Sequence, residues 1–316
     1  MTDSSSSEII KEIWGYTPSY GANLCLLILW CMVGIVQLIL ALPTLQFFFG
    51  ISMLLGCGLE IIGYRSRVAA HSDLGSLLNY MLNYLCLMVA PVCLMAAIYS
   101  AFGNVIEAYS KDYSVLKPIN YRRIFILLDF LSFCIQIGGS ITSASDDTST
   151  AEAGGHVLLG GLLLQVITMF IFMALQATFF IRVSKAKHSG HDAYLDPRYE
   201  SVRNSRYFKF TVVAMFVSTV LIFVRSIYRV FLETNDDSGA AMKKEAFFLG
   251  MDGFMCCIAV ALITVFYPGI SFRKMRKLRK SSSYSEVEKT NTDAQGNIYA
   301  PPNNTPEFNG PTRVII

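Results

Sequence analysis

The chain has 316 residues, of which 53% are hydrophobic and 16% are charged, and its mean hydropathy is +0.46. This composition is typical of polytopic membrane proteins and excludes an ordinary water-soluble domain. The formal net charge of +3 is small, so the positions of the charges are more informative than their sum, and no nucleic-acid partner is expected.

The first 21 residues are polar and slightly acidic, and no basic cluster precedes the apolar run that follows them. This pattern does not match a cleaved signal peptide, so we expect residues 1–21 to form an extracellular N-terminal segment. Seven later stretches are long and apolar enough to cross a bilayer as helices. These predicted spans cover approximately residues 22–42, 46–64, 77–102, 123–141, 157–181, 210–231 and 247–267.

Proline and glycine mark the irregularities that we expect in these spans. Pro43 should break the chain between the first two spans, and Pro91 should kink the third. At the start of the fifth span, four glycines would allow a neighbouring helix to approach closely; they are Gly154, Gly155, Gly160 and Gly161. All eight cysteines lie in apolar stretches, which predicts small buried packing residues and neither disulfides nor a metal site.

The distribution of Lys and Arg predicts the orientation of the chain in the membrane. If the N-terminus lies outside, the inner segments and the start of the tail carry 17 basic residues and the outer segments carry five. Under the positive-inside rule, this bias predicts an outside N-terminus and a cytoplasmic C-terminus. The expected fold class is therefore an all-α membrane protein, a bundle of seven transmembrane helices over residues 22–272.

The character of the chain changes after Phe272. Six basic residues lie between Arg273 and Lys280, directly after the last span. They could bind anionic lipids of the inner leaflet or act only as a topology anchor. The rest of the segment 273–316 is polar and rich in Pro and Asn, which predicts a disordered cytoplasmic tail.

Two arginines lie within the sixth span. Arg225 and Arg229 are four residues apart and therefore share one helix face. A charge in a lipid-embedded helix costs roughly 2.5 to 3.5 kcal/mol on insertion scales, so each should face a partner or a polar cavity. A rise of about 1.5 Å per residue places Glu60, Gln136 and Asp252 at a similar depth on three other helices. The sequence thus predicts a shared polar chamber in the outer half of the bundle.

The fourth and fifth spans contribute further polar residues. Asp129 and Ser132 extend the polar face that includes Gln136, with Asp129 near mid-membrane or somewhat inside it, and Gln165 lies in the fifth span. Two interpretations are open. The acids could only neutralise the arginines and lock the bundle, or the chamber could bind a ligand. The number of polar groups at one depth favours a ligand or transport cavity.

Several of these stretches resemble the fungal lipid-translocating exporter family, also called the Rta-like or resistance-to-aminocholesterol family. The similarity covers about Tyr16 to Phe272. It is carried by Glu60–Arg67 in the second span, Ala90-Pro91 in the third, Asp129–Gly139 in the fourth, Gly160–Gln165 in the fifth, Arg225–Glu233 in the sixth, and Asp252 with Tyr267-Pro268-Gly269 in the seventh. The chain departs from the family pattern at Gly253-Phe254-Met255 and at Tyr267, which bears on the identity of the cargo.

The resemblance implies seven transmembrane helices, a plasma-membrane or related location, and transport of amphipathic lipids such as sphingoid long-chain bases. We therefore expect translocation or efflux of such a lipid or of a related toxic amphiphile. The arginines would bind an acidic head or phosphate, the carboxylates would bind the arginines or an amine, and aromatic residues would flank them. The expected substrate-binding residues are Glu60, Tyr64, Tyr99, Asp129, Gln136, Gln165, Arg225, Tyr228, Arg229 and Asp252.

Other classes of function are less well supported by the sequence. It contains no phosphate-binding loop motif and no arguable Ser/His/Asp arrangement, so we expect neither an enzyme nor a bound cofactor or metal. A seven-helix sensor or receptor is an alternative because it would share the topology, and a regulator of lipid asymmetry that moves nothing itself is another. The cargo, the direction and energy source of transport, the oligomeric state, and the choice between plasma and internal membranes stay open.

Overall fold

The computed structural model describes residues 19–44, 46–72, 76–143, 145, 147–188, 196–234 and 248–279. The chain divides into two compact units, Met1–Met275 and Arg276–Ile316. Every helix described below belongs to the first unit, except that the last helix ends at Arg279. Most of the expected N-terminal segment, Lys280 and the rest of the expected tail lie outside the described residues.

Seven helices of the described residues are long and apolar enough to cross a membrane. The last is composite, because one π-helical turn, η4 (Leu249–Phe254), precedes α11 (Met255–Val265) and further helical residues up to Arg279. The other six are α2 (Tyr20–Thr44), α3 (Phe47–Ala70), α4 (Leu77–Tyr109), α5 (Pro118–Ser143), α6 (Thr148–His188) and α8 (Arg206–Thr234). Short helical turns η1 (Lys111–Tyr113), η3 (Pro197–Tyr199) and α7 (Glu200–Arg203) lie between them. The predicted all-α fold with seven spans is confirmed, whereas the orientation stays a prediction.

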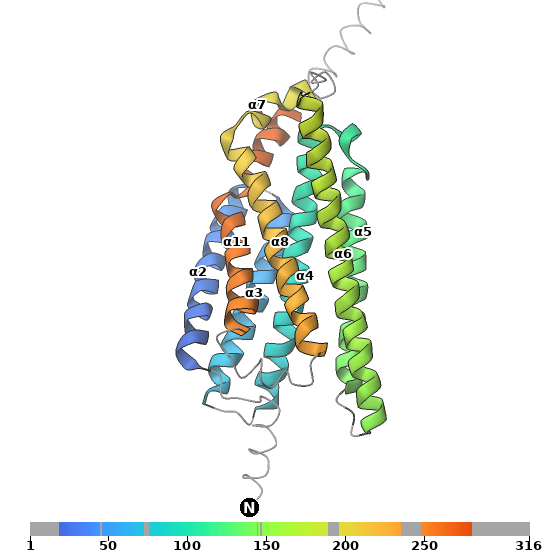
Figure 1. Cartoon of the computed structure of the whole chain (residues 1–316). Coiled ribbons are helices and arrows are strands. Elements are labelled where there is room, and N and C mark those ends of the chain that lie inside the picture. The colour runs from blue at the N-terminus through green and yellow to red at the C-terminus, as the bar shows by residue number, and fades with distance from the viewer. Residues whose placement is uncertain are drawn as a thin grey trace, which may run out of the picture. The chain divides into compact units, whose positions relative to one another are not determined.

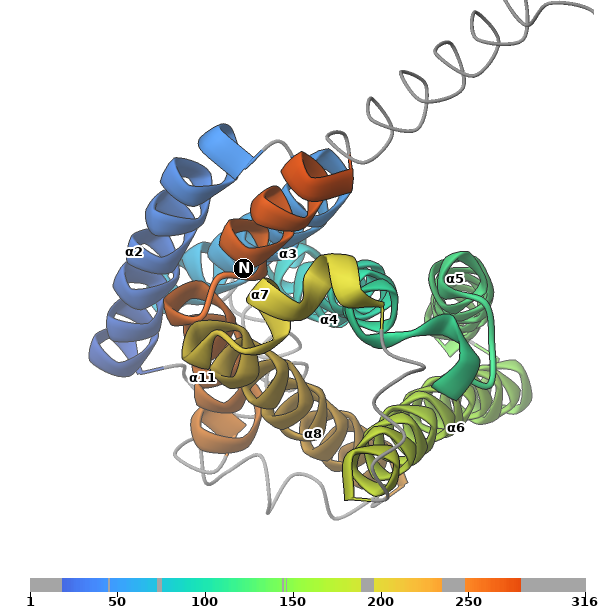
Figure 2. The same cartoon turned by 90° about the horizontal axis from the view of Figure 1, so that it is seen from above.

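Successive helices run in opposite directions, so the bundle has two ends (Figure 1). We call the end at which α2, α4, α6 and η4 begin the N-side, and the opposite end the C-side. Helices that follow one another in the chain pack together, and α11 returns to α2, so the seven spans form a closed ring. The view along the bundle places α5 and α6 on one side of this ring and α2, α3 and α11 on the other (Figure 2).

The helices extend beyond the predicted spans at most ends. The helix α3 continues to Ala70, past Arg65 and Arg67. Arg67 is buried and its Nε donates a hydrogen bond to Asn23 Oδ1 of α2 over 2.9 Å, so this basic residue packs inside the bundle and does not end the helix. Pro43 lies within the last turn of α2, and the break predicted at this residue occurs only after Thr44. Hydropathy alone does not predict these helix ends, because contacts with neighbouring helices determine where each helix stops.

The cysteines correct one expectation. The eight are free, as expected, but only four are buried: Cys57, Cys86, Cys256 and Cys257. Cys25 and Cys134 are exposed on the outer faces of their helices. An apolar stretch in a membrane helix predicts contact with lipid as readily as burial, so the composition could not separate the two.

Close packing of α5 against α6 depends on glycine. A Cβ atom on Gly154 would lie 2.3 Å from the backbone nitrogen of Ser143, and one on Gly139 would lie 2.3 Å from that of Leu158. Gly161 likewise packs against Gln136. Gly155 and Gly160 have open space around them, so only half of the four glycines predicted to promote close helix contact do so.

The C-side half of the bundle is filled by aromatic side chains of α4, α5 and α6. The ring of Phe172 lies 4.6 Å from that of Tyr99 and 5.6 Å from that of Phe102, in edge-to-face arrangements. Tyr121 and Phe125 of α5 complete the cluster. All five side chains are buried. Edge-to-face pairs add to the stability of such a core beyond the area that they bury.

A group of polar contacts lies next to this aromatic core on the C-side and connects the end of α4 to the segment before α8. Arg203 of α7 donates to the carbonyl of Ala108 near the end of α4 and to the carbonyl of Asp196. The side chain of Arg198 donates to both carboxylate oxygens of Asp196, and these hydrogen bonds hold the pKa of Asp196 below its usual range. The carbonyls at the end of α4 are thereby connected to the segment that precedes α8.

Candidate ligand-binding cavity

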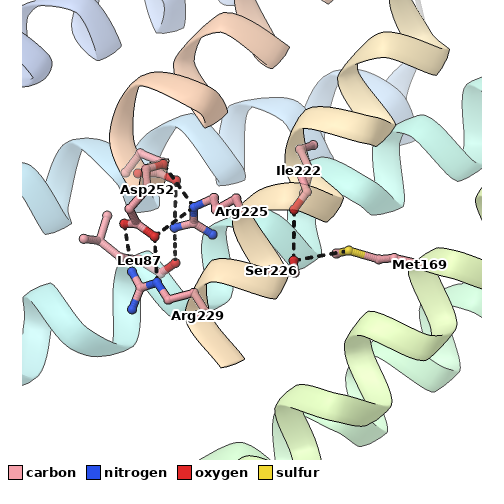
Figure 3. A network of polar contacts seen from close by, with 8 residues as sticks. Leu87, Met169, Ile222, Arg225, Ser226, Arg229 and Asp252 are labelled. Carbon is pink, nitrogen blue, oxygen red and sulfur yellow. Dashed lines mark hydrogen bonds and ion pairs between the residues drawn. The ribbon is translucent and has the colours of Figure 1, made fainter. Parts of the chain in front are cut away.

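The two arginines of α8 converge on one carboxylate. Arg229 forms a bidentate pair with Asp252, with Nε 2.6 Å from Oδ1 and Nη2 2.8 Å from Oδ2. Arg225 Nε lies 3.1 Å from the same Oδ1. Asp252 is fully buried in the π-helical turn η4, and Figure 3 shows both guanidinium groups directed toward it. The predicted proximity of these three residues is therefore present in the structure.

Arg225 also bonds to the backbone at two irregular points of neighbouring helices. Its Nη2 donates to the carbonyl of Leu87 over 2.9 Å, and its Nε donates to the carbonyl of Asp252 over 3.1 Å (Figure 3). Leu87 precedes Pro91 by four residues, and a proline has no N–H with which to occupy that carbonyl. Arg225 thus occupies the acceptor that Pro91 leaves without a helical partner, which explains why α4 remains a continuous helix through Pro91.

Glu60 of α3 is the second acid of this cluster and is held much less tightly. Its Oε1 lies 3.7 Å from Arg225 Nη2. The residue is 0% exposed, and among the described residues neither carboxylate oxygen has a hydrogen-bond partner of normal geometry. The Cys256 thiol, a weak donor, lies beside the carboxylate. An ionised carboxylate buried in this way carries a desolvation penalty of several kcal/mol. One long ion pair, the more distant charge of Arg229 and the weak thiol donor offset this penalty.

Asp129 lies apart from the arginines. It accepts a hydrogen bond from the hydroxyl of Tyr99 over 2.8 Å, at the edge of the aromatic core on the C-side. The depth estimate already placed Asp129 further in than the other acids, and the structure shows that its partner is a tyrosine of α4. The expectation that it could pair with Arg225 or Arg229 does not describe this conformation.

Gln136 and Gln165 form a separate polar contact between α5 and α6. Gln136 Nε2 donates to Gln165 Oε1 over 2.8 Å, and the Ser132 hydroxyl donates to the carbonyl of Gly161. These bonds join the two helices at the point where Gly161 lets them approach. The predicted polar face of the fourth span therefore packs mainly against the fifth.

The two remaining aromatic candidates lie inside the bundle wall. Tyr64 is fully buried, and a Cβ atom on Gly253 would lie 2.3 Å from its hydroxyl oxygen, so this tyrosine depends on a glycine in the π-helical turn. Tyr228 is buried on α8, between the two arginine positions in sequence. The binding roles predicted for Tyr64, Tyr99 and Tyr228 stay predictions.

A cavity of about 850 Å³ lies in the N-side half, between α4, α5, α6 and α8. Its volume is within the range of small-molecule sites. Arg225 and Arg229 line it from α8, and Gln136 and Gln165 line it from the opposite helices. The cavity therefore joins the arginine cluster to the glutamine pair, although the two do not touch. Most of its wall is apolar and includes Met81, Leu85, Met88, Leu158, Leu162 and Leu232.

Three oxygen acceptors of the cavity-lining residues are not used by the described part of the protein. Asn83 Oδ1 and Gln136 Oε1 are buried without a hydrogen-bond partner. Glu233, one turn after Arg229, also lines the cavity. Its side chain is exposed and lies within electrostatic range of Arg229, but no described residue donates a hydrogen bond to its carboxylate. The guanidinium groups of Arg225 and Arg229, in contrast, are bonded to Asp252.

Sequence reasoning missed Asn83, Glu233 and the pair formed by Arg67 and Phe248. The guanidinium of Arg67 lies 4.5 Å from the centre of the Phe248 ring, and that of Arg229 lies 5.7 Å from it. A signal for Glu233 was present, because it follows Arg225 and Arg229 at four-residue steps on one helix face. No comparable pattern marked Asn83. The described residues contain no group of three or more His, Cys, Asp or Glu side chains suited to a metal.

A family model described as "RTA1 like protein" matches residues 53–275. The chain belongs to the RTA1-like family. This match includes α4, α5, α6 and α8, which surround the cavity, and confirms the resemblance inferred from the sequence. No solved structure matches the chain.

Three yeast relatives illustrate the family. The chain is 29% identical to the sphingoid long-chain base transporter RSB1 of Saccharomyces cerevisiae over 298 residues, which cover 82% of this chain and 74% of that protein. It is 24% identical to Protein RTA1 of the same organism over 292 residues, 84% of this chain and 88% of the relative. Protein RTM1, also from Saccharomyces cerevisiae, is 24% identical over 216 residues, 68% of this chain and 66% of the relative.

Proposed function

We propose that this RTA1-like protein translocates an amphipathic lipid whose headgroup is cationic and carries hydroxyl groups, and that the N-side cavity binds it. The observation that carries the proposal is that acceptor oxygens of the cavity wall have no donor among the described residues, while the arginines of the wall already have a carboxylate partner. Asn83, Gln136 and Glu233 offer unused acceptor oxygens, whereas both arginines of α8 are already bonded to Asp252. A ligand with an ammonium group and hydroxyl groups would donate hydrogen bonds to these acceptors.

An anionic headgroup is a weaker fit to the same wall. A phosphate that took the Nε and Nη2 donors of Arg229 would have to displace Asp252, to which hydrogen bonds of 2.6 and 2.8 Å join this guanidinium. Removing one partner of such a pair is strongly unfavourable unless the ligand replaces it completely. Our preference for a cationic head therefore replaces the earlier expectation that Arg225 and Arg229 bind an acidic one.

The apolar part of the wall suits the hydrocarbon chain of the lipid. Side chains of α4 and α6, among them Met88, Leu158 and Leu162, pack together beside the polar groups. Methionine and leucine surfaces accept chains of varied shape. The relative named as a sphingoid long-chain base transporter supports a lipid of this class, since such a base combines an amine, hydroxyl groups and one long chain. We further propose a plasma-membrane location with the N-side facing outward, as the basic residues of the sequence indicate.

Purified protein in liposomes provides the test. We expect flux of a fluorescent sphingoid long-chain base, little flux of its phosphorylated form, and a loss of base flux of about tenfold or more in Glu233→Gln, because a charge-assisted hydrogen bond contributes about 1.5–3 kcal/mol. Glu152→Gln is the matched control, since Glu152 is exposed on α6 at the same end and does not line the cavity. Normal flux in Glu233→Gln would reject this headgroup site, and no flux of any lipid would favour a sensor or regulator.

A further inference from the structure

The two buried acids of the arginine cluster differ in how well they are bonded. Asp252 receives contacts of 2.6, 2.8 and 3.1 Å from two guanidinium groups. Glu60 has a single ion pair of 3.7 Å, and no described residue donates to it with normal hydrogen-bond geometry. If both acids served only to neutralise the arginines, both should be bonded equally well. The structure thus singles out Glu60 as the carboxylate for which the neutral form is least costly.

The charged groups that face Glu60 come from two other elements. Arg225 and Arg229 approach from α8 and Asp252 from η4. With Glu60 ionised, the two acids balance the two arginines. With Glu60 protonated, the group carries one positive charge more, while Arg225 keeps its bonds to Asp252 and to the Leu87 carbonyl. The cluster can therefore change its charge by one without losing its shorter bonds.

The other titratable groups within electrostatic range of Glu60 are thiols and a phenol, which are neutral near pH 7 at their ordinary pKa values. They lie on α3, α4 and α11 and are Cys57, Tyr64, Cys86, Cys256 and Cys257. None of them supplies a charge that would compensate for a change at Glu60. Among the described residues around Glu60, the arginines and Asp252 decide the electrostatic effect of its protonation.

Arg225 connects Glu60 to the ligand cavity. Glu60 does not line the cavity, whereas Arg225 contacts Glu60 with one nitrogen and lines the cavity as well. An extra positive charge in the cluster acts on a cationic headgroup in the cavity through low-dielectric surroundings, where repulsion is stronger than in water. Binding of an ammonium and protonation of Glu60 are therefore expected to oppose each other.

We propose that Glu60 is a proton-binding site that couples proton movement to lipid transport, so that one proton is taken up for each cationic lipid released. The carboxylate of Glu60 gains the proton and becomes a carboxylic acid, and the lipid leaves with its ammonium unchanged, so charge and atoms balance. On the opposite side of the cycle the proton is lost before the next lipid binds. This inference rests on the proposed function, and it adds an energy source that the proposed function leaves open.

Binding measured as a function of pH tests the coupling. The full-length protein in lipid nanodiscs is titrated with a fluorescent sphingoid long-chain base between pH 5 and pH 8, approximately the range in which the coupling should operate. We expect wild-type affinity to fall as the pH falls, by up to about tenfold per pH unit at the steepest point. Glu60→Gln, which mimics the protonated form, should bind more weakly and lose most of this slope. An unchanged slope in Glu60→Gln would overturn the proposal.

Two controls separate folding and headgroup effects from coupling. Glu60→Asp keeps a titratable carboxyl and should restore a pH dependence, and Glu152→Gln should behave as wild type. Proton release can be measured on the wild-type protein without any variant. In a weakly buffered solution, lipid binding should release protons at the pH values where affinity changes. Binding without proton release at any of these pH values would contradict the proposal even if Glu60→Gln fails to fold.

Proteoliposomes with a pH gradient distinguish this inference from the proposed function. Wild type should move the base faster when protons can flow in the opposite direction, and Glu60→Gln should respond to the gradient several-fold less. Base flux that ignores the gradient in wild type would reject coupling at Glu60 and leave lipid transport in place. Absence of any base flux in wild type would reject the proposed function itself.

Discussion

The two halves of the bundle use the same helices for opposite purposes. In the N-side half, α4, α5, α6 and α8 surround a cavity of about 850 Å³ with unused acceptor oxygens among its lining residues. In the C-side half, α4, α5 and α6 close on a core of aromatic rings around Phe172. In the proposed transport cycle, these rings would have to separate before a ligand in the cavity could continue toward the C-side. The difference between the halves is what one state of an alternating-access cycle requires.

The arginine cluster lies in the N-side half. Removing its main carboxylate should have the largest effect on the stability of the protein. Asp252→Asn would leave the buried Arg225 and the partly buried Arg229 with only the distant carboxylates of Glu60 and Glu233 as counter-charges. We expect a loss of about 3–5 kcal/mol in the free energy of unfolding, because an uncompensated buried charge is strongly destabilising. Thermal unfolding of the purified protein measures it. Glu152→Gln should unfold like wild type, and equal stability of both variants would show that the cluster does not hold the bundle together.

The aromatic core can be weakened without changing any charge. Phe172→Ala should cost about 3 kcal/mol of stability and leave a void where four aromatic neighbours meet. If this core is the C-side barrier, the variant should also leak lipid without a gradient. Phe170→Ala is the matched control, because Phe170 lies two residues away on the outer face of α6. Similar leak rates in the two variants would argue against the barrier.

A smaller change should move the cavity wall itself. Gly161→Ala would place a Cβ atom 2.7 Å from Gln136 Cγ and should push α5 away from α6 at a cost of about 1–3 kcal/mol. Gly160→Ala meets open space and should be neutral. Base flux in liposomes and thermal unfolding would both be measured. Equal results for the two alanine variants would mean that the contact between α5 and α6 does not shape the cavity.

The sequence predicted what depends on one coordinate, depth in the membrane. Hydropathy located all seven helices, and helix rise brought Arg225, Arg229, Glu60 and Asp252 to one level, where the structure joins them. It could not predict which neighbour each helix face would meet. Gln136 therefore bonds to Gln165 and not to an arginine, and Asp129 bonds to Tyr99.

Backbone irregularities were the other reason why the structure differs from the predictions made from the sequence. Pro91 was expected to kink its helix, but no sequence pattern indicated that Arg225 would occupy the carbonyl of Leu87. The π-helical turn around Asp252 has no pattern in a hydropathy profile, yet it determines where that carboxylate lies. Arg225 bonds to the backbone of both irregular segments and lies 3.7 Å from Glu60, an arrangement that became visible only in three dimensions.

Labelling of a cysteine in the cavity tests the central claim, that the N-side cavity binds a cationic amphipathic lipid, most directly. Ser140→Cys lines the cavity, and Ser149→Cys lies on the exposed start of α6 as a control. Their reaction with a water-soluble maleimide would be followed with and without a sphingoid long-chain base. The account predicts that the base slows labelling at residue 140 several-fold, that its phosphorylated form does so far less, and that residue 149 is unaffected. Equal labelling at residue 140 with and without the base would contradict it.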